Sequence, residues 1–168
     1  RTNNLNNPQS WRMWNGEGFN LPFRNPYLTS GPYAGVSYTE ARANPAMYFC
    51  ATIDANLNGL QGSVAWNTAL EKYMAVGNRG NGTTVPCGFY YALSNDLIHW
   101  SRPKMLRAGN LPWCDQNAPS DNYPSIIDHS ELDPNFEATD NQFHVYFTRL
   151  IQGLDRDLKR QLITITPS

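Results

Sequence analysis

From residue 46 onward, hydrophobic side chains occur in short runs separated by polar turn residues, a pattern typical of β-strands. The runs predict strands at Met47–Ile53, Ser63–Asn67, Lys72–Val76, Gly88–Leu93, Lys104–Leu106, Tyr123–Ile127, Phe143–Leu150 and Arg160–Thr166. The short charged segment Asp155–Arg160 is predicted to be a turn. Because no stretch of useful length has a helical period, the pattern predicts an all-β fold.

Four of these strands follow one another through tight connections within residues 62–107. A glycine-rich hairpin loop, residues 77–84, joins the second strand to the third, and Ser94 or Asn95 is placed to cap a turn after the third. A four-stranded antiparallel meander of this size is the unit of a β-propeller blade. This segment is therefore predicted to form one full blade.

Residues 123–168 contain three predicted strands and a long polar loop. Propellers commonly complete their last blade with a strand from the other end of the chain, so this segment is predicted to be an incomplete last blade. With Met47–Ile53 as an outer strand of a preceding blade, the chain covers roughly the last two to three blades of a propeller. Such a piece leaves a strand edge unpaired, so we expect the remainder of the propeller as further chain or as a second polypeptide.

The first part of the chain has a different composition, rich in Asn, Pro, Gly and Arg. Residues 1–46 are therefore predicted to be an irregular wrapping segment and blade edge, and residues 47–168 to be the C-terminal blades. The wrapping segment carries scattered aromatic side chains that we expect to hold it against a larger body, namely Trp11, Trp14, Phe19, Phe23 and Tyr27.

Charged residues make up only 16% of the chain, and 13 Lys and Arg against 14 Asp and Glu give a net charge of −1. Without a basic surface to hold a phosphate backbone, nucleic-acid binding is not expected. Aromatic residues make up 12%, and the polar residues are mainly Asn, Ser, Thr and Gly. That composition suits an extracellular protein that contacts glycans through aromatic stacking and amide hydrogen bonds.

No apolar run reaches the length of a membrane span. The chain begins at Arg1 without an apolar signal segment, so we expect a processed or partial chain of a secreted protein. Cys87 and Cys114 both lie in predicted loops, and a disulfide between them is expected in an oxidising compartment. Cys50 lies in an apolar run and is predicted to be a buried core thiol, although a partner in sequence outside this chain remains open.

Four stretches carry a resemblance to a known family: Ser10–Phe19 with Asn25–Tyr27, Ser63–Met74, Gly88–Trp100, and Tyr123–Asp128 with Asn135–Glu137 and Val145–Phe147. The most specific is a tyrosine-rich strand followed by Ser-x-Asp-Leu-x-x-Trp, which ends at Trp100. Together they resemble the five-bladed β-propeller glycoside hydrolases of the arabinanase and xylosidase type, family 43 and its relatives. The match is closest to a set of uncharacterised secreted bacterial members.

The resemblance implies a secreted, carbohydrate-active propeller that acts on polysaccharides. In that family, a base, a general acid and an orienting acid lie near the central axis and usually come from the first three blades. No residue here matches those catalytic motifs, so the catalytic acids are expected outside this chain and no catalytic residue is assigned. The alternative is a propeller that has lost catalysis and serves as a glycan-binding or extracellular structural subunit.

Three residues are candidates for contact with a sugar. The candidates are Trp14, Glu17 and Asp128. Glu17 is an acid between two glycines and lies close in sequence to Trp14, and Asp128 is the first residue of the densest acidic cluster, residues 128–133. Glycoside hydrolysis needs two carboxyls about 5–10 Å apart. The favoured alternative for Asp128 is a solvated loop in which its carboxylate bonds to nearby backbone. No cofactor or metal site is predicted, because the cluster lacks the spacing of a calcium loop, and an axial calcium stays open.

Asn81-Gly82-Thr83 is an N-glycosylation sequence in a predicted surface loop. The Asn-Gly pair is equally well explained as a hairpin turn. The sequence therefore leaves glycosylation of Asn81 as one of two interpretations.

Overall fold

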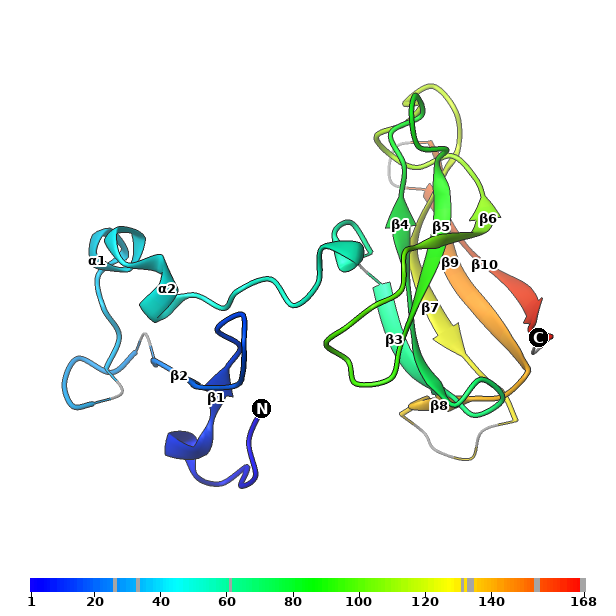
Figure 1. Cartoon of the computed structure of the whole chain (residues 1–168). Helices are drawn as coiled ribbons and strands as arrows, with labels where there is room; N and C mark the ends of the chain where they lie inside the picture. Colours follow the sequence, from blue (N-terminus) through cyan, green and yellow to red (C-terminus); the bar gives the residue numbers. More distant parts are fainter. Residues whose placement is uncertain are drawn as a thin grey trace. The chain divides into compact units, whose positions relative to one another are not determined.

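The computed structural model describes residues 1–25, 27–32, 34–60, 62–130, 132, 135–152 and 155–166. The chain divides into two compact units, Arg1–Ile53 and Asp54–Ser168 (Figure 1). The structure is mainly β, with 41% strand and 10% helix, and its sheets have mixed topology. A mainly β fold, as the hydrophobic pattern predicts, is therefore confirmed.

The first unit has little regular structure. Its elements are the 3-10 turn η1 (Pro8–Ser10), the two-residue strands β1 (Arg12–Met13) and β2 (Leu21–Pro22), and the helices α1 (Tyr38–Ala43) and α2 (Pro45–Tyr48). Ser37 caps α1, since its hydroxyl accepts a hydrogen bond from the backbone N–H of Glu40 at 3.1 Å. Pro45 occupies the start of α2, where its fixed φ favours a helix and its missing N–H costs nothing.

The strand predicted at Met47–Ile53 is wrong. Met47 and Tyr48 belong to α2, and the residues that follow them are not in a strand. Within the described part of the chain no strand pairs with this hydrophobic run, and Pro45 starts a helical turn directly before it. Cys50 is exposed, so the prediction of a buried core thiol is also wrong.

The second unit contains a five-stranded sheet with the order β6-β5-β4-β3-β8. Its strands are β3 (Gly62–Asn67), β4 (Lys72–Arg79), β5 (Gly88–Ser94), β6 (Lys104–Ala108) and β8 (Ala138–Thr139). The first four pair in sequence order and antiparallel, which confirms the four-stranded meander predicted for residues 62–107. The short strand β8 was not predicted, and it pairs parallel to β3.

A second sheet has three antiparallel strands in the order β10-β9-β7, as the sequence predicts for the C-terminal segment. They are β7 (Ser120–Ile127), β9 (Gln142–Gln152) and β10 (Asp155–Thr164). The turn predicted at Asp155–Arg160 is wrong, because these residues begin β10. Asp157 pairs with Arg149 of β9, and charged residues are well suited to the edge strand of a sheet.

The two sheets pack face to face around one apolar core (Figure 1). Alternate residues of β9, namely Phe143, Val145 and Phe147, face this core, as the two-residue period of a strand requires. Phe147 meets Phe89 of β5 edge to face, with ring centroids 5.2 Å apart. Each such fully buried side chain stabilises the fold by about 1.5–3 kcal/mol.

A buried ion cluster joins the two sheets beside this core. Asp121 of β7 is only 2% exposed and accepts hydrogen bonds from Arg107 of β6 at 2.6 Å and from Arg149 of β9 at 2.8 and 3.0 Å. The Arg107 guanidinium carbon lies 4.6 Å from the ring centroid of Phe147 and 5.6 Å from that of Phe89. Arg107 is thus held between two aromatic rings and a buried carboxylate.

The opposite face of the second sheet is open. Leu158 and Leu162 of β10 pair with Thr148 and His144 and lie on the face away from the core. These two leucines are 70% and 53% exposed. The two sheets therefore do not form a sealed sandwich within the described residues.

Candidate functional site

The structure places Trp14 and Glu17 in the first unit. Trp14 packs edge to face on Phe19, with ring centroids 5.3 Å apart, and lines an apolar cavity of about 290 Å³. Glu17 lies in an exposed turn in which Asn15 accepts its backbone N–H at 3.0 Å, and it is not among the described lining residues of that cavity. Sugar contact by these two residues stays a prediction.

Asp128 follows β7 and is only 3% exposed. Its carboxylate accepts hydrogen bonds from the backbone N–H and the hydroxyl of Ser130, at 2.9 and 2.6 Å, and from the backbone N–H of Asp140 at 2.9 Å. Burial raises the pKa of Asp128, but these hydrogen bonds outweigh burial and hold the pKa below its ordinary value. Asp128 thus organises the loop after β7; two other acids of its cluster, Glu131 and Asp133, lie outside the described residues.

A cavity of about 530 Å³ opens at the other end of β7, in the second unit. We call it the Trp113 pocket. Its described lining residues come from the end of β4, the start of β7 and the neighbouring loops: Gly59, Asn78, Arg79, Gly80, Trp113, Asn122 and Tyr123. Its volume is within the usual range for a small-molecule site, about 300–1,000 Å³.

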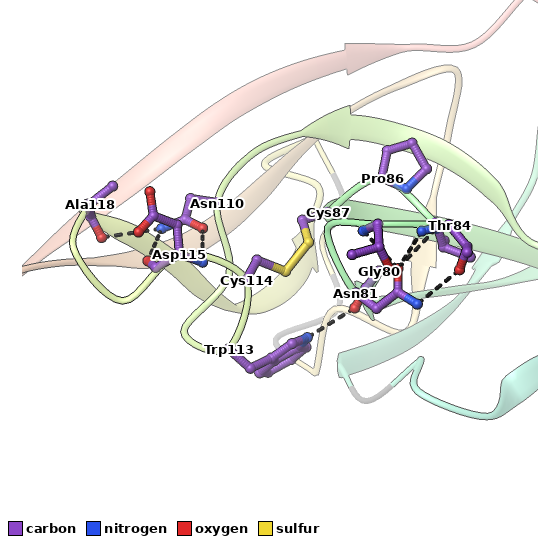
Figure 2. The surroundings of a disulfide bond; sticks show 12 residues. Gly80, Asn81, Thr84, Pro86, Cys87, Asn110, Trp113, Cys114, Asp115 and Ala118 are labelled. Carbon is purple, nitrogen blue, oxygen red and sulfur yellow. Dashed lines mark hydrogen bonds between the residues drawn. A yellow bond between two sulfur atoms is a disulfide. The ribbon is translucent and has the colours of Figure 1, made fainter.

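Two exposed aromatic rings wall the Trp113 pocket. Trp113 is 52% exposed, yet its indole N–H donates a hydrogen bond to the carbonyl oxygen of Gly80 at 3.0 Å, which fixes the ring (Figure 2). The next residue, Cys114, forms the predicted disulfide with Cys87, with their Cα atoms 6.6 Å apart. The loop that carries Trp113 is thereby tied to the start of β5.

Tyr123 is the second ring, and its backbone is strained. The residue has a φ of 55°, in the left-handed region that non-glycine residues rarely adopt. It lies where the pairing of β7 with β9 shifts between Asn122 and Ser125, at a β-bulge. Such a conformation costs about 1–3 kcal/mol and often marks a functional position. Tyr123 is 60% exposed, so burial does not explain this strain.

Two amides complete the wall. Asn78 is 6% exposed, and its side-chain N–H donates to the side-chain oxygen of Asn122. The side-chain oxygen of Asn78 is buried and has no hydrogen-bond partner among the described residues. An unpaired buried acceptor costs about 1–3 kcal/mol, and because this oxygen has almost no accessible surface, a ligand hydroxyl would reach it only if the amide turned toward the pocket.

The sequence did not indicate this pocket. Trp113 was not singled out, and Tyr123 entered only as the start of a predicted strand and of one stretch that carries the family resemblance. A usable signal is the sequence Asn122-Tyr123-Pro124, because an asparagine and a proline around an aromatic residue are unusual inside a regular strand. Flat apolar rings beside amide groups can hold a sugar, whose ring has an apolar face and a hydroxyl edge.

Comparison with protein-family models, with curated proteins and with solved structures found no match to this chain. Within the described residues, no group of three or more His, Cys, Asp or Glu side chains is arranged to hold a metal ion. No helix in the described ranges combines the length and apolar character needed to cross a membrane. The disulfide is compatible with an oxidising, extracellular environment.

Asn81 organises the hairpin loop beside the Trp113 pocket. Its side-chain oxygen accepts the backbone N–H groups of Thr83, Thr84 and Val85 at 3.0–3.1 Å. Its amide nitrogen, the atom to which a glycan would be attached, donates to the Thr84 hydroxyl at 2.9 Å (Figure 2). Asn81 therefore has a structural role in the loop, and its glycosylation stays a prediction.

We expect Asn81→Ala to lower the free energy of unfolding by about 1–2 kcal/mol, because the loop loses several hydrogen bonds at once. Thr83→Ala is the matched control, since it removes the glycosylation sequence but keeps the backbone N–H that Asn81 accepts. Chemical denaturation of both variants measures the difference. Equal stability of the two variants would contradict a structural role for Asn81.

Proposed function

We propose that this chain contributes neighbouring blades to a secreted, carbohydrate-active β-propeller of the five-bladed glycoside-hydrolase type and binds glycan in the Trp113 pocket. The pocket carries the proposal, since the aromatic residues Trp113 and Tyr123 line it together with the amide residues Asn78 and Asn122. Aromatic surfaces combined with a few placed polar groups are typical of ligand sites.

The arrangement of the two sheets supports a propeller. In both sheets the strands of the meander follow sequence order, and β7 lies against β3 and β4. The side-chain amide of Asn67, at the end of β3, donates to the carbonyl oxygen of Asp140 at 2.6 Å. Asp128, just after β7, accepts the N–H of the same residue. The two strands therefore end at the same place, as the inner strands of successive blades do.

The open face of the second sheet supports the same architecture. A propeller blade packs on a neighbour at each face, and the exposed leucines Leu158 and Leu162 offer an apolar surface for a further blade. The remainder of the propeller is thus the partner that we propose for this face.

Binding, rather than hydrolysis, is the activity that this pocket supports. Its described lining residues include no carboxyl group, whereas glycoside hydrolysis needs two. An enzymatic function would require acids from elsewhere in the propeller. Release of reducing sugar from arabinan and xylan by the complete polypeptide tests that alternative.

The binding proposal is tested by affinity electrophoresis of the complete polypeptide in a panel of plant and microbial polysaccharides. We expect Trp113→Ala to weaken binding about tenfold, because the sugar loses one stacking face. Tyr38→Ala is the control, because Tyr38 is an exposed aromatic residue that lines neither the Trp113 pocket nor the cavity at Trp14. Absence of retardation by every polysaccharide, or equal binding by the two variants, would refute the proposal.

A further inference from the structure

We infer that the Trp113 pocket selects an acidic sugar, a uronate within a polysaccharide, and that Arg79 binds its carboxylate. The inference rests on the proposed glycan binding and names the ligand class of the same pocket. Arg79 is the one charged residue among the described lining residues, which include no acidic side chain. The pocket therefore has a positive wall inside a chain whose net charge is −1.

The position of Arg79 suits a carboxylate. It is the last residue of β4 and is half-buried, and one guanidinium nitrogen donates to the carbonyl oxygen of Asn58 at 3.3 Å. A guanidinium has five N–H donors, and within the described residues this is the only hydrogen bond that the Arg79 side chain makes. Its remaining donors match the two oxygens of a carboxylate, a strong charge-assisted pairing.

The other groups of the pocket fit the rest of such a sugar. A uronate ring has an apolar face for Trp113 or Tyr123 and hydroxyl groups along its edge. If the Asn78 amide turns toward the pocket, a hydroxyl can donate to its unpaired side-chain oxygen, next to Arg79 in the sequence. A carboxylate could not satisfy that atom, because both groups only accept hydrogen bonds. The pocket thus offers an acceptor for a hydroxyl and a donor for an acid.

A neutral sugar fits less well for a physical reason. Seating it in the pocket would remove water from the Arg79 guanidinium without supplying a negative partner, and desolvating an unpaired charge is unfavourable. The pocket would discriminate against neutral sugars through this desolvation of Arg79 as much as through the ion pair between Arg79 and the uronate carboxylate.

The test measures binding of galacturonate oligomers and of neutral galactose oligomers of equal length to the complete polypeptide by titration calorimetry. We expect the acidic oligomer to bind about tenfold more tightly at low salt, and Arg79→Gln to remove that advantage while affinity for the neutral oligomer changes less than twofold. Arg79→Lys keeps the charge without the two-pronged geometry and is expected to restore part of the affinity. Arg102→Gln, at an exposed arginine outside the pocket, is the matched control.

The outcomes separate the two proposals. Uronate selection would be overturned if both oligomers bind with equal affinity and Arg79→Gln does not change that affinity. If Trp113→Ala then abolishes binding, the proposal of glycan binding stays in place. Failure of both oligomers and of the polysaccharide panel to bind would overturn both proposals. If Arg79→Gln does not fold, the salt dependence decides, because affinity of the unaltered protein for galacturonate that does not fall with salt would refute the ion pair.

Discussion

Asp121→Asn is expected to lower the free energy of unfolding by about 3–5 kcal/mol, the typical cost of breaking a buried ion pair by removing one partner. Asparagine keeps the shape of the side chain but leaves Arg107 and Arg149 without their shared counter-charge. Arg107 is the more affected of the two, because its side chain is only 20% exposed and lies between two phenylalanine rings.

Asp157→Asn provides the control for this prediction. The Asp157 carboxylate forms an ion pair with the Lys159 ammonium at 2.7 Å, but both side chains are more than 40% exposed. The free energy of unfolding is therefore expected to change by less than about 1 kcal/mol. Urea denaturation of both variants measures the two effects. A loss of less than about 1 kcal/mol in Asp121→Asn would show that the cluster does not hold the sheets together.

The same cluster predicts a dependence of stability on pH. Burial raises the pKa of Asp121, but hydrogen bonds and charges from Arg149 and Arg107 outweigh burial and lower the pKa below its ordinary value. A carboxyl whose pKa is lower in the folded state stabilises the fold above its unfolded pKa, about 3.9. That contribution is lost as the pH falls through the folded pKa. Acid titration of Asp121→Asn should therefore show a smaller loss of stability in this range than the unaltered protein.

Removal of the disulfide by the double substitution Cys87→Ala and Cys114→Ala is expected to cost about 2–4 kcal/mol. The two cysteines are 27 residues apart in sequence, so the bond restricts a sizeable loop in the unfolded chain. Thermal unfolding and urea denaturation measure the loss. Cys50→Ser is the control, because Cys50 is a free, exposed thiol whose replacement should leave stability unchanged.

The disulfide variant should also lose affinity for glycan. Cys114 follows Trp113 directly, and the hydrogen bond from Trp113 to Gly80 depends on the same loop position. With the disulfide absent, the ring must be ordered when the ligand binds, which weakens binding. A double variant that is destabilised but binds glycan with unchanged affinity would show that the hydrogen bond alone positions Trp113.

Sequence reasoning predicted the strands whose short hydrophobic runs stand between turn residues. Strands β3 to β7 were found in this way, and β9 was found because Phe143, Val145 and Phe147 recur at every second position. Reasoning failed where local chemistry overrode the pattern. Pro45 starts a helix just before an apolar run that is otherwise typical of a strand. The charged residues of Asp155–Arg160 lie on an edge strand, where water can solvate their side chains.

The Trp113 pocket was beyond sequence reasoning because its parts meet only in three dimensions. Asn78 ends β4, Tyr123 lies at a bulge in β7, and Trp113 belongs to a loop held by a disulfide. Their separation along the chain exceeds 30 residues between Asn78 and Trp113, and no local pattern links them. The disulfide itself could be predicted, because only its two cysteines lay in loops of an otherwise β-type sequence.

The left-handed backbone at Tyr123 has a consequence for laboratory evolution. Glycine adopts this conformation freely, so Tyr123→Gly would relieve torsional cost at an exposed position. A library screened only for heat resistance would then favour loss of the tyrosine, and with it loss of recognition under the proposed function. Thermostability and ligand capture are opposed at this one residue, and a screen must select for both to retain it.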